Sequence, residues 1–312
     1  MSENKNKNKI LVALDGSEKA FRTINYICSF KPFLKKKLVL HNIITKVPEC
    51  YYDMQKDDFS FKVTSQVRAW EAGYKAKMEE FMEKARIMLI SSGFKSEAIK
   101  IMITKRKKGI ARDIMDEAQK GYYALLIRRR GGAQQFLPLV MGSVSTKLVE
   151  KTTYLPVMLA GIQKVNHSIL MAIDGSEGAQ RAVEFVAKTV GNSECRVVLC
   201  SVLRDYTVYE ERNMPKKSID FIRAAYEEIE IAVRDASKIL ENAGIQKENI
   251  VIKIVQESKS RAETLVKKAK EENCDTIVFG RKGKSNVSSF DIGRVPWKVI
   301  HGAKEMTVWM IP

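Results

Sequence analysis

Short apolar runs alternate with stretches of helical periodicity along the first half of the chain. The runs predict strands over residues 10–14, 38–44, 99–104, 123–127 and 155–159. Between them, apolar residues at helical spacing predict helices over residues 18–30, 65–92, 111–119 and 143–149. Because the strand residues are apolar at consecutive positions, we expect both faces of the sheet to be covered by helices, as in a doubly wound parallel α/β fold.

The second half repeats this alternation. Its predicted strands cover residues 169–173, 196–203, 250–255, 276–279 and 306–310. Its predicted helices cover residues 179–190, 218–242, 262–270 and 295–300. The tetrapeptide Asp-Gly-Ser-Glu that begins at Asp15 returns at Asp174, and a glycine-rich segment ending at Gly142 returns at Gly293. Since both features recur in the same order, the sequence predicts two tandem domains, residues 1–162 and 163–312.

Net charge distinguishes the two halves. The chain of 312 residues carries a formal charge of +17. Residues 1–160 contribute +14 of this excess and residues 161–312 contribute +3. A basic first half suits an anionic ligand, a nucleic acid or an anionic membrane surface, although a solvated basic surface has the same composition. Basic clusters at residues 105–108 and 128–130 follow strands three and four, where they would either attract a polyanion or form solvated loops.

Several classes of protein are disfavoured by composition. No apolar run approaches the roughly 20 residues needed to span a bilayer, and residues 1–9 are polar, so we expect no membrane insertion and a cytoplasmic location. The 5 cysteines form no C-x-x-C pair and the 3 histidines lie far apart, which argues against a disulfide framework and a zinc site. Ser-His-Asp and Cys-His catalysis find no support in this arrangement.

The candidate chemistry lies at strand ends. In an open parallel sheet, ligands bind beyond the carboxyl ends of the strands, where the strand order reverses. Asp15 and Asp174 follow the first strand of each half, and glycine-rich segments follow the fourth. Glycines let backbone N–H groups approach a phosphate, and a carboxylate can accept hydrogen bonds from a ribose. If Ser17 and Ser176 cap the following helices, the two aspartates are available to a ligand.

Two better-known nucleotide motifs are excluded. The segment Gly283-Lys284-Ser285 resembles the end of a P-loop, but Val278 occupies the position of its first glycine. No G-x-G-x-x-G follows the first strand, so a Rossmann dinucleotide site is not supported.

The repeated Asp-Gly-Ser after strand one, together with the spacing G-x2-G-x9-G-[ST] after strand four, resembles the universal stress protein family. The resemblance covers essentially the whole chain, twice. It implies a five-stranded sheet of order 3-2-1-4-5 in each half and pairing of the two halves through strand five as a pseudo-dimer. In one branch of the family it also implies ATP binding in the crevice between the aspartate and the glycine turn.

In the first half, the resemblance implies nucleotide-binding roles for residues in three places: the end of strand one with the aspartate that follows it, strand two, and the glycine segment. These residues are Ala13, Asp15, Asn42, Gly132, Gly142, Ser143, Val144 and Ser145. The pattern departs from the family at Arg129, which occupies the first glycine position.

In the second half, the corresponding candidates are Ala172, Asp174, Ser201, Gly280, Gly283, Gly293 and Arg294. All three glycines match, but Arg294 replaces the hydroxyl residue and Pro296 replaces the second small residue. Arg294 either grips a phosphate with its guanidinium group or fills the pocket with its own side chain.

These observations predict a nucleotide-binding stress-response regulator or sensor with at most slow ATP hydrolysis. Its expected ligand is ATP or a similar adenine nucleotide, with or without Mg²⁺, and a homodimer of the tandem chain is compatible with the sequence. The alternative is a scaffold that binds no nucleotide and recruits an acidic partner, a lipid head group or a nucleic acid through the basic first half. An ATP-consuming enzyme fits less well, because related enzymes carry an extended phosphate loop after strand one.

Overall fold

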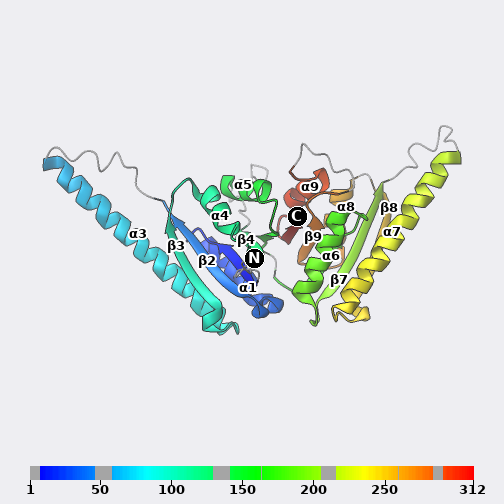
Figure 1. Ribbon diagram of the computed structural model, residues 1–312, viewed down its shortest axis with the longest axis horizontal. Helices are drawn as coiled ribbons and strands as arrows, with labels where there is room; N and C mark the ends of the chain where they lie inside the picture. The colour runs from blue at the N-terminus through cyan, green and yellow to red at the C-terminus, as the bar shows by residue number, and fades with distance from the viewer. Residues whose placement is uncertain are drawn as a thin grey trace, which may run out of the picture. The chain divides into compact units, whose positions relative to one another are not determined.

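The computed structural model describes residues 8–45, 58–128, 141–162, 164–204, 216–258, 260–283 and 291–312, which Figure 1 draws as coloured ribbons. Contacts divide the chain into two compact units. The first unit is Met1–Ser29 with Leu34–Arg128, and the second is Phe30–Phe33 with Arg129–Pro312. The second unit therefore contains the last helix and strand of the first sequence repeat as well as the whole second repeat.

The described strands of the first unit form a parallel sheet in the order β3-β2-β1-β4. The strands are β1 (Lys9–Ala13), β2 (Lys37–Ile44), β3 (Ile99–Lys105) and β4 (Ala124–Arg128). The helices are α1 (Phe21–Ser29), α3 (Asp58–Ser91) and α4 (Ile110–Ala118). Helices α1 and α3 pack against each other. Ile10, Leu11 and Val12 of β1 are fully buried, as expected for a strand covered on both faces.

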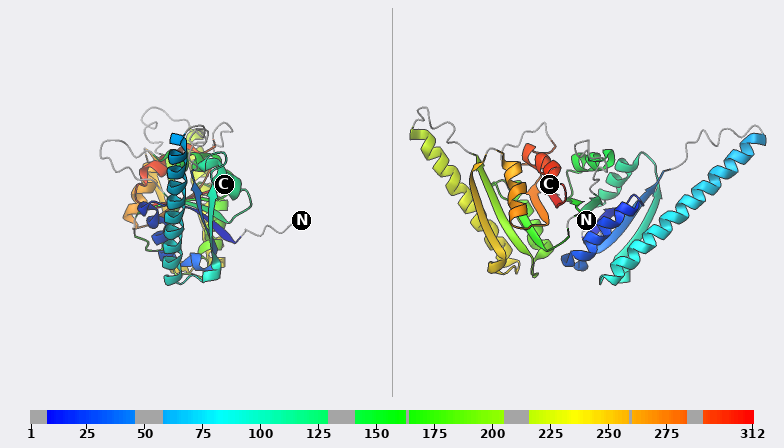
Figure 2. Two further views of the ribbon diagram at one scale, coloured as in Figure 1. Left: turned by 90° about the vertical axis from the view of Figure 1, so that its left-hand side faces the viewer. Right: turned by 180° about the vertical axis from the view of Figure 1, so that it is seen from behind.

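The second unit repeats this architecture and completes it. Its strands are β5 (Val157–Ala160), β6 (Ser168–Ala172), β7 (Arg196–Arg204), β8 (Ile250–Ser258), β9 (Thr276–Gly280) and β10 (Thr307–Ile311). Its helices are α5 (Ser143–Lys151), α6 (Glu177–Val190), α7 (Lys216–Asn242), α8 (Arg261–Glu271) and α9 (Arg294–Gly302). The strands follow the order β8-β7-β6-β9-β10, which is the predicted order 3-2-1-4-5. Helix α6 packs on α7 and α8 packs on α9, and Figure 2 shows the long helices α3 and α7 each beside the strands of its own unit.

The two fifth strands pair as predicted. β5 and β10 are antiparallel, with Met158 opposite Trp309, whereas the neighbouring pair β9 and β10 is parallel. After β5 the chain passes close to the start of β10, because a β-carbon on Gly161 would lie 2.2 Å from the carbonyl oxygen of Glu305. The predicted doubly wound α/β fold and its pairing through strand five are therefore confirmed.

Helix starts differ from the predicted bounds. Residues Glu18–Ala20 form a 3-10 turn and α1 begins only at Phe21, because Ser17 makes no capping hydrogen bond. In the second unit, Ser176 accepts a hydrogen bond from the N–H of Ala179 (3.2 Å), and α6 begins directly at Glu177. Further 3-10 turns cover Lys31–Lys35, Ser96–Ala98 and Lys247–Asn249.

Helix α3 begins at Asp58, before the predicted residue 65. The apolar periodicity that predicted this helix lies in its C-terminal turns, where Phe81, Ala85 and Leu89 are buried. Among the helices of the described segments, none is both long enough and apolar enough to cross a bilayer.

An aromatic cluster forms around Trp309 in β10. Trp309 is fully buried, and the centroids of Phe30, Phe33 and Phe185 lie 5.4–6.0 Å from its ring. Phe30 and Phe33 come from the short segment that joins the second unit, and Phe185 comes from α6. The burial of these large rings is a major source of stability for the second unit.

We expect Trp309→Ala to lower the free energy of unfolding by about 3–5 kcal/mol, because it removes a buried ring and leaves a cavity. Chemical denaturation of the full chain measures this loss. Trp70→Ala is the control, since Trp70 is 55% exposed and its replacement should cost about 1 kcal/mol or less. Equal losses in the two variants would contradict the central position of Trp309 in the core.

Candidate functional site

In the second half, the structure brings Asp174 and the glycine turn together. β6 and β9 are parallel neighbours, so the segments that follow their carboxyl ends lie at the same edge of the sheet. A β-carbon built on Gly283 would lie 2.4 Å from Oδ2 of Asp174. Only a glycine therefore allows the turn after β9 to approach the carboxylate this closely. This juxtaposition is the one that the sequence motif predicted.

Ser176 orients the Asp174 carboxylate. Oδ1 accepts hydrogen bonds from the N–H (3.0 Å) and the hydroxyl (2.5 Å) of Ser176. The same hydroxyl oxygen accepts the N–H of Ala179 and so caps α6. Within the described part of the chain, Oδ2 accepts no hydrogen bond. Ser176 is thus the helix cap, and Asp174 keeps one oxygen for a ligand.

Gly280 has a packing role in addition to its place in the motif. It is buried at the end of β9, and a β-carbon on it would lie 2.5 Å from the carbonyl oxygen of Gly178. Conversely, a β-carbon on Gly178 would lie 2.5 Å from the carbonyl oxygen of Lys282. Two glycines therefore allow backbone contact between the glycine turn and the first turn of α6.

Gly293 and Arg294 begin α9 beside this turn. Gly293 is the N-cap residue of α9, and its N–H donates to the carbonyl oxygen of Arg281 (3.0 Å). Arg294 is the first residue of the helix and its side chain is exposed, so its guanidinium group is accessible to solvent. Pro296, which replaces the second small residue of the family pattern, is buried and has no backbone N–H to donate.

The remaining second-half candidates lie at the same edge. Ala172 ends β6 half-buried and is opposite Cys200 of β7. Ser201, the next residue of β7, is 2% exposed. The N–H of Ile173 donates to the carbonyl oxygen of Cys200 (2.9 Å), which extends the sheet up to Asp174.

In the first half, the Asp15 carboxylate forms an ion pair with an arginine. Ala13 ends β1 and Asp15 follows it, with Oδ1 accepting the N–H (3.1 Å) and hydroxyl (2.7 Å) of Ser17. Unlike the situation at Asp174, Oδ2 accepts a hydrogen bond from Arg128 at the end of β4 (2.9 Å). Partial burial alone would raise the pKa of Asp15, but the hydrogen bonds from Ser17 and the Arg128 guanidinium outweigh it and lower that pKa.

Asn42 has an internal hydrogen bond. It is 2% exposed, and its side-chain N–H donates to the carbonyl oxygen of Leu14 (2.8 Å). Its Oδ1 atom is buried without a hydrogen-bond partner. Next to it, Gly16 has φ of +72°, and a β-carbon there would lie 2.2 Å from the sulfur of Met78. Helix α3 therefore covers the turn that follows β1.

The glycine segment of the first half is described only from its C-terminal end. Gly132 and Arg129 lie outside the described residues. Gly142 is the N-cap residue of α5, and Ser143, Val144 and Ser145 form its first turn. Ser143 is exposed, whereas Val144 and Ser145 are half-buried. These residues belong to the second unit, while Ala13, Asp15 and Asn42 belong to the first.

Residues 166–312 match the sequence model of the universal stress protein family. The matched span runs from just before β6 to the end of β10 and contains Asp174, Gly283 and Gly293. The second half of the chain is therefore similar in sequence to the universal stress protein family.

The fold likeness extends over both halves. A solved universal stress protein from Archaeoglobus fulgidus DSM 4304 is 20% identical, with 98% of each chain covered and a TM-score of 0.61. A candidate universal stress protein from Pseudomonas aeruginosa UCBPP-PA14 is 14% identical, with 99% of this chain and 94% of that chain covered and a TM-score of 0.53. At these identities the likeness shows the fold alone. No curated protein sequence matches this chain.

The sequence did not reveal the role of Arg281, which lies inside the glycine motif of the second half. Its side chain is 4% exposed and donates to the carbonyl oxygens of Val149, Glu150 (2.7 Å) and Asp291 (2.8 Å). Val149 and Glu150 belong to the last turn of α5, whose carbonyls lack partners within the helix. Burial lowers the pKa of Arg281 to about 10, so the group is charged at neutral pH.

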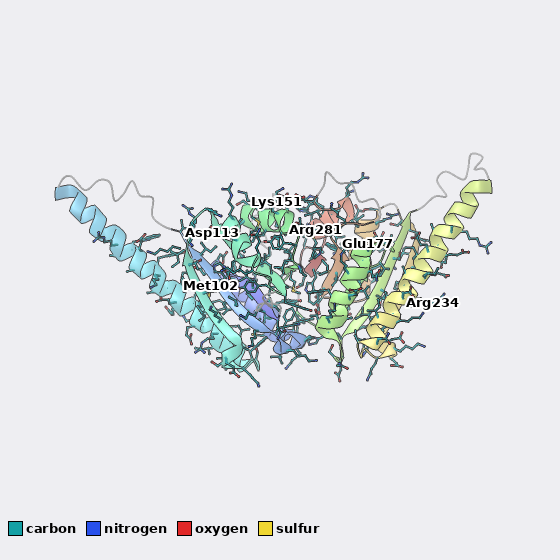
Figure 3. All side chains as sticks on the ribbon, viewed as in Figure 1. Met102, Asp113, Lys151, Glu177, Arg234 and Arg281 are labelled. Atoms are coloured by element: carbon teal, nitrogen blue, oxygen red, sulfur yellow. The ribbon has the colours of Figure 1, made fainter. Side chains whose placement is uncertain are left out.

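An ion pair reinforces this anchor. Lys151, the last residue of α5, lies 2.9 Å from the carboxylate of Asp291, and Figure 3 labels Lys151 and Arg281. The glycine turn of the second half is thereby attached to the C-terminal end of α5. The sequence does show an arginine between two motif glycines. It could not show what this arginine binds, because the acceptors are backbone carbonyls, which are the same for every residue type.

The basic segment after β3 is held by α4. The carboxylate of Asp113, labelled in Figure 3, accepts the backbone N–H groups of Lys107 (2.7 Å) and Lys108 (3.0 Å). The Lys108 ammonium group pairs with Asp116 at 2.8 Å. One lysine of the predicted basic cluster is therefore neutralised locally.

We expect Arg128→Gln to raise the pKa of Asp15 toward its ordinary value of 3.8. The folded-state pKa of Asp15 lies below that value. The Asp15–Arg128 interaction therefore stabilises the native state in full at pH values above 3.8, and this stabilisation is lost as the pH falls through the folded-state pKa. The stability difference between wild type and variant should therefore shrink in acid. NMR titration of the Asp15 carboxyl carbon measures the pKa, and an unchanged pKa would exclude the Asp15–Arg128 pair. Arg22→Gln, at an exposed position of α1, is the control.

Arg281→Met should lower the free energy of unfolding by about 2–4 kcal/mol, because several buried carbonyl oxygens lose their donor. Arg294→Met, at an exposed arginine of α9, should change it by no more than about 0.5 kcal/mol. Thermal or chemical denaturation compares the two. If Arg281→Met leaves the free energy of unfolding unchanged, the hydrogen bonds of Arg281 do not contribute to stability.

Proposed function

We propose that this protein binds an adenine nucleotide of the ATP type, and that the crevice between Asp174 and the glycine turn of the second half is its principal site. The observation that carries the proposal is the contact between Asp174 Oδ2 and Gly283, where a β-carbon would lie only 2.4 Å from the oxygen. It supports a site in which a carboxylate and a glycine backbone lie side by side and can face one ligand.

The chemistry of the crevice suits the parts of a nucleotide. Oδ2 of Asp174, which has no partner among the described residues, can accept hydrogen bonds from ribose hydroxyls. The glycine turn and the N-terminus of α9 supply backbone N–H groups and a partial positive charge for phosphate oxygens. Arg294, exposed at the first position of that helix, can add a charge-assisted hydrogen bond. Ala172, Ser201, Gly280 and Gly293 complete the proposed set, and Mg²⁺ would arrive with the nucleotide.

The contacts favour the second half over the first. In the second half, the oxygen of Asp174 that faces Gly283 has no partner among the described residues, whereas the equivalent oxygen of Asp15 is held by Arg128. A ligand at Asp15 must compete with this guanidinium group. We therefore propose the described first-half residues of the first unit, Ala13, Asp15 and Asn42, only as a secondary site.

Regulation rather than fast catalysis fits the position of the histidines. His167 precedes β6 and His301 lies in the last turn of α9, so both lie at the opposite ends of their elements from the Asp174 edge. Neither can serve there as a general base for an attacking water. We propose a cytoplasmic stress-response regulator made of two domains, residues 1–162 and 163–312, that senses nucleotide and hydrolyses it slowly at most.

Thermal melting of the full chain with and without Mg-ATP tests the proposal. Saturating nucleotide, at about 100 times its dissociation constant, should stabilise the wild type by about 2.7 kcal/mol. Asp174→Asn and Gly283→Ala should remove most of this shift, the first by losing the charge and the second by pushing a methyl group onto Asp174. Asp15→Asn is the matched control from the other repeat and should retain the shift.

Two results would contradict this assignment. A shift that survives in both second-half variants but disappears in Asp15→Asn would move the principal site to the first half. An absence of any nucleotide shift, together with retention on heparin that weakens with salt, would favour the scaffold function that acts through the basic first half.

A further inference from the structure

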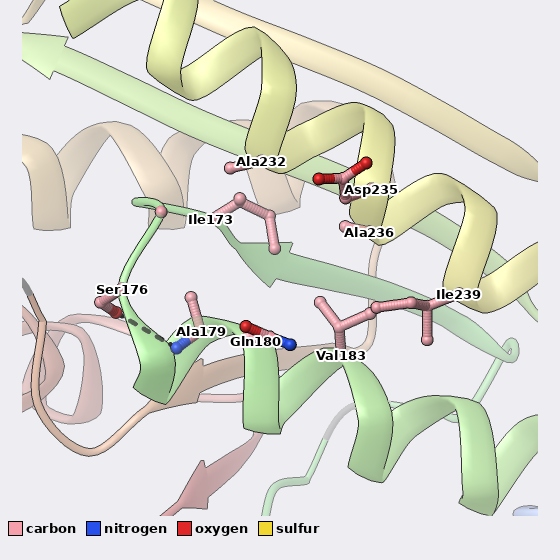
Figure 4. Close-up of a pocket in the computed structure, with 10 residues that line it drawn as sticks. Ile173, Ser176, Ala179, Gln180, Val183, Ala232, Asp235, Ala236 and Ile239 are labelled. Atoms are coloured by element: carbon pink, nitrogen blue, oxygen red, sulfur yellow. Dashed lines mark hydrogen bonds between the residues drawn. The ribbon is translucent and has the colours of Figure 1, made fainter.

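A cavity opens between α6 and α7 in the second half, next to the turn that carries Asp174. Its volume is about 130 Å³. The apolar part of its wall, drawn in Figure 4, consists of Ile173, Ala179, Val183, Ala232, Ala236 and Ile239. Two alanines of α7 and one of α6 thus face one another where larger side chains would fill the gap between the helices.

The first repeat provides an internal comparison for α7. Helices α3 and α7 each end before a glycine with positive φ, at Gly93 (108°) and Gly244 (88°). These equivalent glycines are 151 residues apart, the same offset as between Gly142 and Gly293. Counting back along the two helices by this offset matches Phe81 of α3 with Ala232 of α7.

The same comparison applies to the other wall of the cavity. Counting from the shared tetrapeptide matches Phe21 of α1 with Gln180 of α6. In the first half, the rings of Phe21 and Phe81 pack together with centroids 4.5 Å apart. The second half has an amide and a methyl group at the two positions where the first half has an aromatic pair. The cavity is therefore the space that aromatic rings occupy in the other repeat.

Size and lining define what this space accepts. An apolar cavity of about 150 Å³ in another protein stays dry and binds benzene, so a cavity of this size suits one six-membered ring. Polar groups of Ser176, Gln180 and Asp235 also line it. Carboxylate and amide oxygens accept hydrogen bonds, so they favour a ring that carries an O–H or N–H group.

We propose that the α6–α7 cavity of the second half binds a small monocyclic aromatic compound that bears a hydrogen-bond donor, of the phenol or aniline type. The ring would lie against Ala232 and Val183, in the space that corresponds to the first-half aromatic pair. The donor group would reach Gln180 or Asp235 at the rim. This inference does not depend on nucleotide binding, because the cavity lies on a different set of side chains from the glycine turn.

Titration of the full chain with phenol, followed by calorimetry or NMR, tests this site. We expect one site per chain, and toluene, which lacks the donor, should bind about fivefold more weakly. Ala232→Phe restores the residue of the first repeat and should weaken phenol binding at least about tenfold, since the ring then fills the cavity. Ala224→Phe adds the same ring at an exposed position of α7 and should leave binding unchanged.

A second variant separates this proposal from the nucleotide site. Gly283→Ala, which should lose the nucleotide shift, should bind phenol as the wild type does. The proposal is overturned if the wild type does not bind phenol, or if Ala232→Phe binds it as tightly as Ala224→Phe does. Should Ala232→Phe fail to fold, Val183→Phe, from the α6 wall, provides the same test with the same expected loss.

Discussion

The parallel pairing of β6 with β9 is the constraint on which the second-half site depends. It brings the carboxyl ends of two strands about 100 residues apart in sequence to one edge, and the segments that follow must share the space there. Glycines at 178, 280 and 283 make this possible, because a β-carbon at any of them would collide with a neighbour. The glycine motif thus reflects crowding of the backbone at the strand ends, and the same crowding places Asp174 against the main chain of Gly283.

The two repeats have diverged within one architecture. At the first strand, both retain the aspartate and the serine that orients it. They differ at the end of the fourth strand, where the strand register matches Arg128 of the first repeat with Gly280 of the second. The arginine pairs with Asp15, whereas Gly280 has no side chain, and no cation of the described residues pairs with Asp174. The helices that follow the first strands also differ, because Phe21 of α1, whose ring is packed, corresponds to Gln180 of α6. The two repeats therefore share a backbone geometry and differ in the side chains that it presents.

Much of this architecture could be predicted from the sequence, because apolar runs and their repetition determine where strands and helices lie. The order of the strands and the pairing through strand five followed from the family resemblance and were confirmed. The start of α1 could not be predicted, since Ser17 and Ser176 stand in the same tetrapeptide but only Ser176 caps a helix. The contacts of Arg128 and Arg281 were also missed. One joins a residue 113 positions away, and the other binds backbone carbonyls of a different repeat.

The repeat in the sequence and the compact unit of the structure do not share a boundary. Helix α5 and strand β5 belong to the first repeat, yet they interact with Arg281 and with β10 of the second. A protein cut between the repeats would leave β10 as an open edge strand and the buried guanidinium group without its acceptors. Gene fragments that encode one repeat each would therefore not yield two self-sufficient proteins. In the fused chain, β5 is covalently linked to the second repeat and pairs with β10, whereas a separate second domain would need a strand from another molecule to cover this edge.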